Sequence, residues 1–255
     1  MMTPICHIAV FRRCSALLLC LITAMTLNLA IADVVVVKDE DHLIPVGHLE
    51  TGNLGIVTIG NNDGDTFKDY CKRYVALSSE TDHRNRNIIA VFSSDADAVR
   101  RFRQIFNPAS SIVVFFIPDK DISAFSSVGP LRTFVAAGGT SDTDQKYAAE
   151  IIFGGLATDA RLKSSIKGLA MKGDGVSVNK TRLGYSSPAD QEFAPCLDKA
   201  IDSIIALNIS KGSFSGCQVL VARNGYVVYD KAFGKTESGK NGKTVNRNTL
   251  FDIAS

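Results

Sequence analysis

The sequence predicts an α/β fold in which a mostly parallel sheet is covered by helices on both faces. Short, almost continuous apolar runs recur along the first two-thirds of the chain, and such runs are typical of strands buried on both faces. Segments with helical periodicity lie between them, and this alternation indicates a parallel sheet. The 255 residues, 45% hydrophobic and 21% charged, have an ordinary globular composition.

The predicted strands and helices follow one another along the chain. The strands are Val34–Val37, Leu54–Gly60, Asn87–Phe92, Ser111–Ile117 and Leu131–Ala137. A first helix aligns Phe67, Tyr70, Cys71, Tyr74 and Val75, a second aligns Val99, Phe102, Ile105 and Phe106, and a third aligns Tyr147, Ala148, Ile151 and Ile152. We expect Ser94 to cap the second helix, because serine is a favoured residue at that position.

The chain changes character after the third predicted helix. Residues 156–195 have little periodicity and many Gly, Ser, Lys and Asp residues, so we expect an irregular segment that contains a domain boundary. Beyond it, Leu197, Ile201, Ile204 and Ile205 predict a new amphipathic helix. Gln218–Ala222 and Tyr226–Phe233 then predict a hairpin, because Asn224-Gly225 suits a tight turn. We place a sandwich domain at 33–170, a linker at 171–195 and a second domain at 196–255.

The first 32 residues have the layout of a secretory signal peptide. Arg12 and Arg13 precede an apolar stretch, and Ala30 and Ala32 form an A-x-A cleavage site. The apolar stretch is short for a membrane span, so we expect no stable span and a secreted or periplasmic protein from a bacterium. Cleavage would leave Asp33 directly before an apolar strand without a spacer. An artefactual upstream start therefore stays open as an alternative.

Charge and cysteine content exclude several classes of function. Without Arg12 and Arg13, the 28 basic residues fall to 26 and equal the 26 acidic residues, so no basic surface argues for nucleic acid. Cys71, Cys196 and Cys217 remain after cleavage, an odd number that cannot all pair within the chain. No spacing of cysteine and histidine indicates a metal site, and we expect no metal and no cofactor.

The loop after the second strand could suggest a nucleotide site. It reads GNNDGDTF, in which Gly60 and Gly64 do not have the spacing of a dinucleotide fingerprint. Asp63 and Asp65 lie where a phosphate would bind, and their charge would repel it. We expect a turn with acidic residues that cap the following helix.

Two segments of the first domain carry a family resemblance. Lys38, Asp39 and the run Leu43–Val46 precede a strand, and Phe153, Gly154 and Leu162 follow the third helix. This arrangement resembles the C-terminal α/β sandwich of family 3 glycoside hydrolases over about residues 33–170. Ala160 and Lys163 stand where that family usually has Gly and Pro. In that family the nucleophilic aspartate comes from a preceding barrel domain, which this chain lacks. Cleavage of a glycoside needs two carboxyl groups, and we expect Glu150 and Glu192 to be solvated surface acids.

The last segment carries a second resemblance. GCQVLVARNGYVVYDKAFGKT, followed by VNRNTLFDIAS, resembles the start of the serine β-lactamase and penicillin-binding-protein fold, of the esterase-like kind related to class C β-lactamases. The match implies that Ser255 is a catalytic nucleophile that opens an S-x-x-K motif. The lysine of that motif would stand three residues later, so we expect this chain to hold an incomplete, inactive β-lactamase-like α+β segment.

Together the resemblances imply a fragment of a secreted hydrolase. Some bacterial family 3 glycosidases carry a β-lactamase-like domain after the sandwich, and RLGYSSP at 182–188 is similar to such a junction. The parent would act on carbohydrate as a β-glycoside, and on an ester or a β-lactam-like substrate. The alternative is an exported, non-catalytic α/β domain that binds carbohydrate or docks to a partner.

Overall fold

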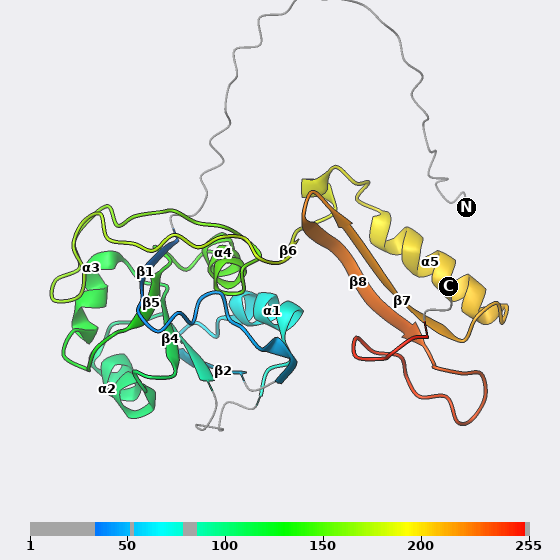
Figure 1. Ribbon diagram of the computed structural model, residues 1–255, viewed down its shortest axis with the longest axis horizontal. Helices are drawn as coiled ribbons and strands as arrows, with labels where there is room; N and C mark the ends of the chain where they lie inside the picture. The colour runs from blue at the N-terminus through cyan, green and yellow to red at the C-terminus, as the bar shows by residue number, and fades with distance from the viewer. Residues whose placement is uncertain (1–33, 52–53, 79–85, 253–255) are drawn as a thin grey trace, which may run out of the picture. The chain divides into compact units, whose positions relative to one another are not determined.

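The computed structural model describes residues 34–51, 54–78 and 86–252 (Figure 1). The predicted signal peptide at 1–32 and the predicted nucleophile Ser255 lie outside these ranges. Five strands form the larger sheet: β1 (Val35–Asp39), β2 (Leu54–Ile59), β3 (Arg86–Val91), β4 (Ser111–Phe115) and β5 (Thr133–Ala136). All five predicted strands are thus confirmed, with small differences at their ends.

The larger sheet is mostly parallel. Its order is β1-β5-β4-β3-β2, in which β2, β3, β4 and β5 run parallel and β1 pairs antiparallel with β5. After the first helix, the chain returns along the outer edge of β2, where the Ser78 N–H donates to the Leu54 carbonyl at 2.9 Å. The predicted α/β class is confirmed.

Helices cover both faces of this sheet, as Figure 1 shows. α1 (Asp65–Tyr74) and α4 (Asp142–Ile152) pack on one face, and α2 (Ala96–Ile105), α3 (Asp119–Ile122) and a 3-10 turn (Ser123–Phe125) pack on the other. Successive strand residues point to opposite faces, so Ile88 and Ile89 enter different clusters. Each large apolar side chain buried in this way contributes about 1.5–3 kcal/mol.

Helix caps correct two sequence predictions. α2 is capped by Asp95, whose carboxylate accepts from the Ala98 N–H at 2.8 Å, and not by Ser94. The N-cap of α1 is Gly64, in the left-handed region at φ 64°, and no side chain caps it. The acidic residues of that loop therefore do not act as the predicted caps.

The third predicted helix is α4, and it begins and ends with recognisable capping motifs. Ser141 and Asp144 form a reciprocal capping box at the start of α4. At the other end Gly154 adopts φ +76°, a conformation that glycine tolerates best and that often ends helices.

The two segments that carry the glycosidase resemblance meet in the structure. The Val46 N–H donates to the Ile152 carbonyl at 2.9 Å, and a Cβ at Gly154 would lie 3.0 Å from the Pro45 ring. The buried Asp39 carboxylate accepts from the backbone N–H of Leu43 at 2.8 Å, which holds the intervening turn. These two segments, which are far apart in the sequence, therefore pack against each other beside the sheet.

The segment after α4 is packed against the sandwich over much of its length. Leu162, Ile166 and Ala170 enter the cluster on the α2 face, and Val178 enters the cluster on the α1 face. The Val176 N–H also donates to the Val36 carbonyl at 2.7 Å. These apolar residues hold the irregular stretch against the sheet and its helices. Their spacing is too wide to produce a helical or strand periodicity in the sequence.

The remaining residues form a smaller unit of sheet and helix. β6 (Gly184–Tyr185) pairs with β8 (Tyr226–Gly234), which pairs antiparallel with β7 (Gly216–Arg223). Asn224 and Gly225 have φ values of 53° and 80°, which confirms the predicted hairpin turn. α5 (Leu197–Ser210) confirms the predicted helix, although none of its residues is buried. Two short 3-10 turns, Leu49–Thr51 and Ala189–Gln191, complete the described elements. No helix in these ranges is long and apolar enough to cross a membrane.

The cap of α2 gives a direct test of local structure. We expect Asp95→Ala to lower the free energy of unfolding by about 1 kcal/mol, because the Ala98 N–H loses its acceptor. Ser94→Ala is the matched control and should change it by less than about 0.5 kcal/mol. Urea unfolding of both variants checks this, and an equal loss for both would contradict the assignment of the cap.

Candidate functional site

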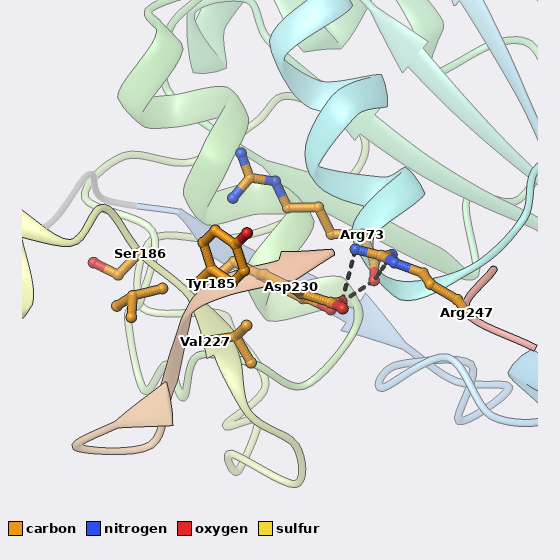
Figure 2. Close-up of a pocket in the computed structure, with 8 residues that line it drawn as sticks. Arg73, Tyr185, Ser186, Val227, Asp230 and Arg247 are labelled. Atoms are coloured by element: carbon orange, nitrogen blue, oxygen red, sulfur yellow. Dashed lines mark hydrogen bonds and ion pairs between the residues drawn. The ribbon is translucent and has the colours of Figure 1, made fainter. Parts of the chain in front are cut away.

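A polar groove runs beside β8 where the smaller sheet meets the end of α1. Its central hollow of about 190 Å³ is lined by Arg73, Tyr185, Ser186, the stretch 227–230 and Arg247 (Figure 2). Two adjoining hollows, of about 260 and 470 Å³, also contain Arg73 and Asp230. We refer to these three hollows together as the β8 groove.

Arg73 and two tyrosines form one wall of the β8 groove. The Arg73 guanidinium lies 4.2 Å from the centre of the Tyr70 ring and 5.6 Å from that of Tyr185. The Tyr185 hydroxyl donates to the Arg73 carbonyl at 2.7 Å, which fixes the ring against the end of α1. Burial raises the pKa of Tyr185, so this hydroxyl stays protonated and can donate.

Asp230 and Arg247 also line the central hollow. Their side chains make an ion pair at 2.8 Å, drawn as a dashed line in Figure 2. Arg247 also donates to the Arg73 carbonyl at 3.1 Å, so that one carbonyl accepts from Tyr185 and from Arg247. Arg247 therefore links Asp230 on β8 to the end of α1.

A buried carboxyl group lies just behind the β8 groove. Glu150 on α4 is 2% exposed, so the expectation that it is a surface acid was wrong, whereas the exposed Glu192 confirms that expectation. The Tyr74 hydroxyl donates to Glu150 Oε2 at 2.7 Å, and the Tyr185 N–H donates to Oε1 at 3.0 Å. Glu150 therefore ties α1, α4 and β6 together.

Burial dominates the ionisation of this carboxyl group. It raises the pKa of Glu150 above its ordinary value of 4.5, although the bonds from Tyr74 and Tyr185 and the charges of Lys146 and Arg73 offset part of the rise. Burial and the Glu150 charge together raise the pKa of Tyr74. Two glycines make room for the group, because a Cβ at Gly155 or Gly184 would collide with Oε2.

A second cavity lies at the carboxyl ends of the parallel strands. It has a volume of about 410 Å³ and includes Asp119 after β4, Gly138 after β5 and the start of β1 at Val35. The stretch 161–164 completes its wall. We refer to it as the β4–β5 cavity.

Cysteine, histidine and acidic side chains add no assembled metal site in the described ranges. No group of three or more His, Cys, Asp or Glu side chains in these ranges could hold a metal ion. Cys71 is buried in the core, and Cys196 and Cys217 are half-buried thiols. Ser255 lies outside the described residues, so its predicted role as nucleophile stays a prediction.

The residues of the β8 groove were missed by the sequence analysis. Arg73 and Arg247 are 174 positions apart, and no local spacing links them. In the sequence, Tyr70 and Tyr74 belong only to an apolar helix face. The one available signal was the concentration of tyrosine in 70–74 and 226–229.

The chain was also compared with known proteins. No known family matches the sequence, and no curated protein matches it. One solved structure that aligns with it is described as a fungal multi-domain GH3 β-N-acetylglucosaminidase with a unique GCN5-related glucosamine N-acetyltransferase region. The identity is 12% and the TM-score 0.42, over 69% of this chain and 21% of that chain, so this chain spans about a fifth of its length. At this level the similarity assigns neither a family nor a function.

The raised pKa of Glu150 predicts that the stability of the protein depends on pH. Its raised pKa means that the folded state favours the neutral carboxyl, so its stabilising contribution is full below pH 4.5 and is lost as pH rises through the folded-state pKa. We expect Glu150→Gln, which stays neutral, to gain stability relative to the wild type as pH rises from 4 to 8.

The measurement is urea unfolding of both proteins across that range. Glu237→Gln is the control, since Glu237 is exposed, and its difference from the wild type should stay flat. A flat difference for Glu150→Gln as well would show that the buried carboxyl does not titrate with folding.

Proposed function

We propose that the chain is a non-catalytic accessory part of a secreted β-glycosidase of the family 3 type, and that it binds a β-linked glycan. Residues 33–170 would be the sandwich domain, and residues 196–255 would be the beginning of a β-lactamase-type serine hydrolase. The β8 groove is the observation that carries the binding function. The contact between the segments around Pro45 and Gly154 supports the family type, because both segments carry that resemblance.

The chemistry of the β8 groove suits a sugar ring. Tyrosine rings offer an apolar face for ring C–H groups and a hydroxyl for hydrogen bonds. The planar guanidinium groups of Arg73 and Arg247 present several N–H donors in a fixed geometry, and Ser186 and Asp230 add acceptors. Of the three hollows, the one of about 470 Å³ is within the range of small-ligand sites, roughly 300–1,000 Å³.

The exposure of apolar side chains supports the proposal that the second domain is incomplete. Large apolar side chains on α5 and β7 are open to solvent: Ile204 is 60% exposed, Leu207 52% and Leu220 57%. A helix and a hairpin that bury so little are marginal alone, and a larger domain would cover this face. The serine hydrolase activity of that domain, on an ester or a β-lactam-like substrate, would need residues beyond Ser255.

Glycan binding can be tested by calorimetry with a panel of β-1,3- and β-1,4-linked oligosaccharides. We expect at least one to bind, and Arg73→Ala to weaken that binding about tenfold or more, because a charged hydrogen bond is worth about 1.5–3 kcal/mol. Arg103→Ala, on the exposed side of α2, is the matched control and should bind as the wild type does.

The proposal also predicts no release of reducing ends from any oligosaccharide that binds. Hydrolysis that persists through repeated purification and is abolished in an Asp230→Asn variant would contradict a non-catalytic role. Binding of no panel member at millimolar concentration would contradict the carbohydrate ligand itself.

Limited proteolysis tests the second domain. We expect cleavage within the exposed stretch 187–195, followed by degradation of the helix and hairpin, because α5 buries none of its residues. The sandwich should survive as a resistant core, measured by mass spectrometry of the fragments. A resistant fragment that starts near residue 196 would instead show that this part folds alone.

A further inference from the structure

The larger sheet has two places where neighbouring strands send the chain to opposite faces. β2 leads to α1 on one face and β3 leads to α2 on the other, while β4 leads to α3 and β5 leads to α4, again on opposite faces. At such a switch point the two loops diverge, and the crevice at the carboxyl ends of the strands is where open α/β sheets bind ligands.

The first of these crevices is closed by packing. A Cβ at Gly60 would lie 2.8 Å from the Ser93 nitrogen and 2.9 Å from the Phe92 carbonyl carbon, so the two loops touch. A Cβ at Gly64 would lie 3.0 Å from the Phe92 ring. No room is left between β2 and β3 for a ligand at these positions.

The second crevice is open, and it is the β4–β5 cavity. Pro118, Asp119 and Lys120 leave β4 on one side, and Gly138 leaves β5 on the other. A Cβ built at Gly138 would meet nothing within 4 Å, which marks open space next to the backbone. The volume of about 410 Å³ is within the range of small-ligand sites and far exceeds what a single water occupies.

Positive charge predominates around the β4–β5 cavity. Its lining contains Lys120, Arg161 and Lys163 against one acid, Asp119. The Arg161 guanidinium is oriented by the carbonyls of Asp159 and Ala160, at 2.6 and 3.0 Å, and by the Ser177 hydroxyl at 2.9 Å. Within the described ranges neither Lys120 nor Arg161 makes an ion pair, so their charge is not neutralised by a carboxylate there.

The rest of the lining combines hydrogen-bonding and apolar groups. Burial raises the pKa of Asp119, while the Ser164 hydroxyl at 3.5 Å and the Lys163 charge offset part of the rise. This carboxyl group and the hydroxyl can bond to ligand O–H groups. Val35 and Leu162, both buried, supply an apolar floor. A ligand that matches all three features carries an oxyanion, several hydroxyls and a compact ring.

We propose that the β4–β5 cavity binds a sugar acid of the uronate type, with its carboxylate toward Lys120, Arg161 and Lys163 and its hydroxyls toward Asp119 and Ser164. The site is separate from the β8 groove and does not depend on the function proposed for that groove. A cavity with this charge favours an anionic sugar over a neutral sugar of the same size. Both sugars make the same ring contacts, but only the anionic sugar has a carboxylate that the basic side chains attract.

The test uses the full chain, with D-glucuronate and D-galacturonate as probes and D-glucose and inorganic phosphate as comparators. Binding is followed by calorimetry and by NMR shifts of residues around 119 and 162. At least one uronate should bind about tenfold or more tightly than glucose and than phosphate, and more weakly at high salt. The Lys120→Gln, Lys163→Gln double variant should lose about tenfold in uronate affinity with its thermal unfolding unchanged.

Two control variants distinguish uronate binding in the β4–β5 cavity from binding elsewhere on the protein. Lys167→Gln removes an exposed charge from the same stretch of chain outside the cavity, and Arg73→Ala alters the β8 groove, so both should bind uronate as the wild type does. Uronate binding no tighter than that of glucose would overturn the proposal. So would phosphate binding as tight as uronate binding, which would indicate a bare anion site, or unchanged affinity in the double variant.

Discussion

Burial of both faces of the five-stranded sheet is the constraint on which the rest of this structure depends. The strands must be apolar on both sides over most of their length, so few of their central side chains are available for chemistry. Functional groups are thereby restricted to the loops at the carboxyl ends of the strands and to the edges of the sandwich. The β4–β5 cavity lies among the loops at the carboxyl ends of the strands. The β8 groove lies beside the end of α1, at an edge of the sandwich.

The same constraint explains why the sequence predicts the sheet well. Runs such as 111–117 are apolar because both faces are covered, and a run of that kind is visible without any knowledge of its neighbours. The tight hairpin at Asn224-Gly225 is predictable for a similar reason, since its geometry depends on two adjacent residues. Errors arise where two neighbours are chemically alike, as with Ser94 and Asp95, both of which are good capping residues.

The β8 groove and the β4–β5 cavity could not be predicted, because each is formed by residues that are far apart in the sequence. Glu150 reads as a surface acid on a helix until α4 is placed against α1 and β6. Arg247 reaches the Arg73 carbonyl only when the segment after β8 is placed beside the end of α1. The β4–β5 cavity depends on strand order and on which face each helix covers, and neither follows from hydrophobic periodicity.

The distribution of aromatic residues gives the protein a built-in spectroscopic reporter. The chain contains no tryptophan, so its ultraviolet emission comes from six tyrosines. Four of them, Tyr70, Tyr74, Tyr185 and Tyr229, line the β8 groove, and none lines the β4–β5 cavity. A ligand in the groove would therefore change the emission of the unlabelled protein directly, whereas one in the cavity would leave it almost unchanged. Tyrosine fluorescence of the unlabelled protein can thus distinguish a ligand in the β8 groove from one in the β4–β5 cavity.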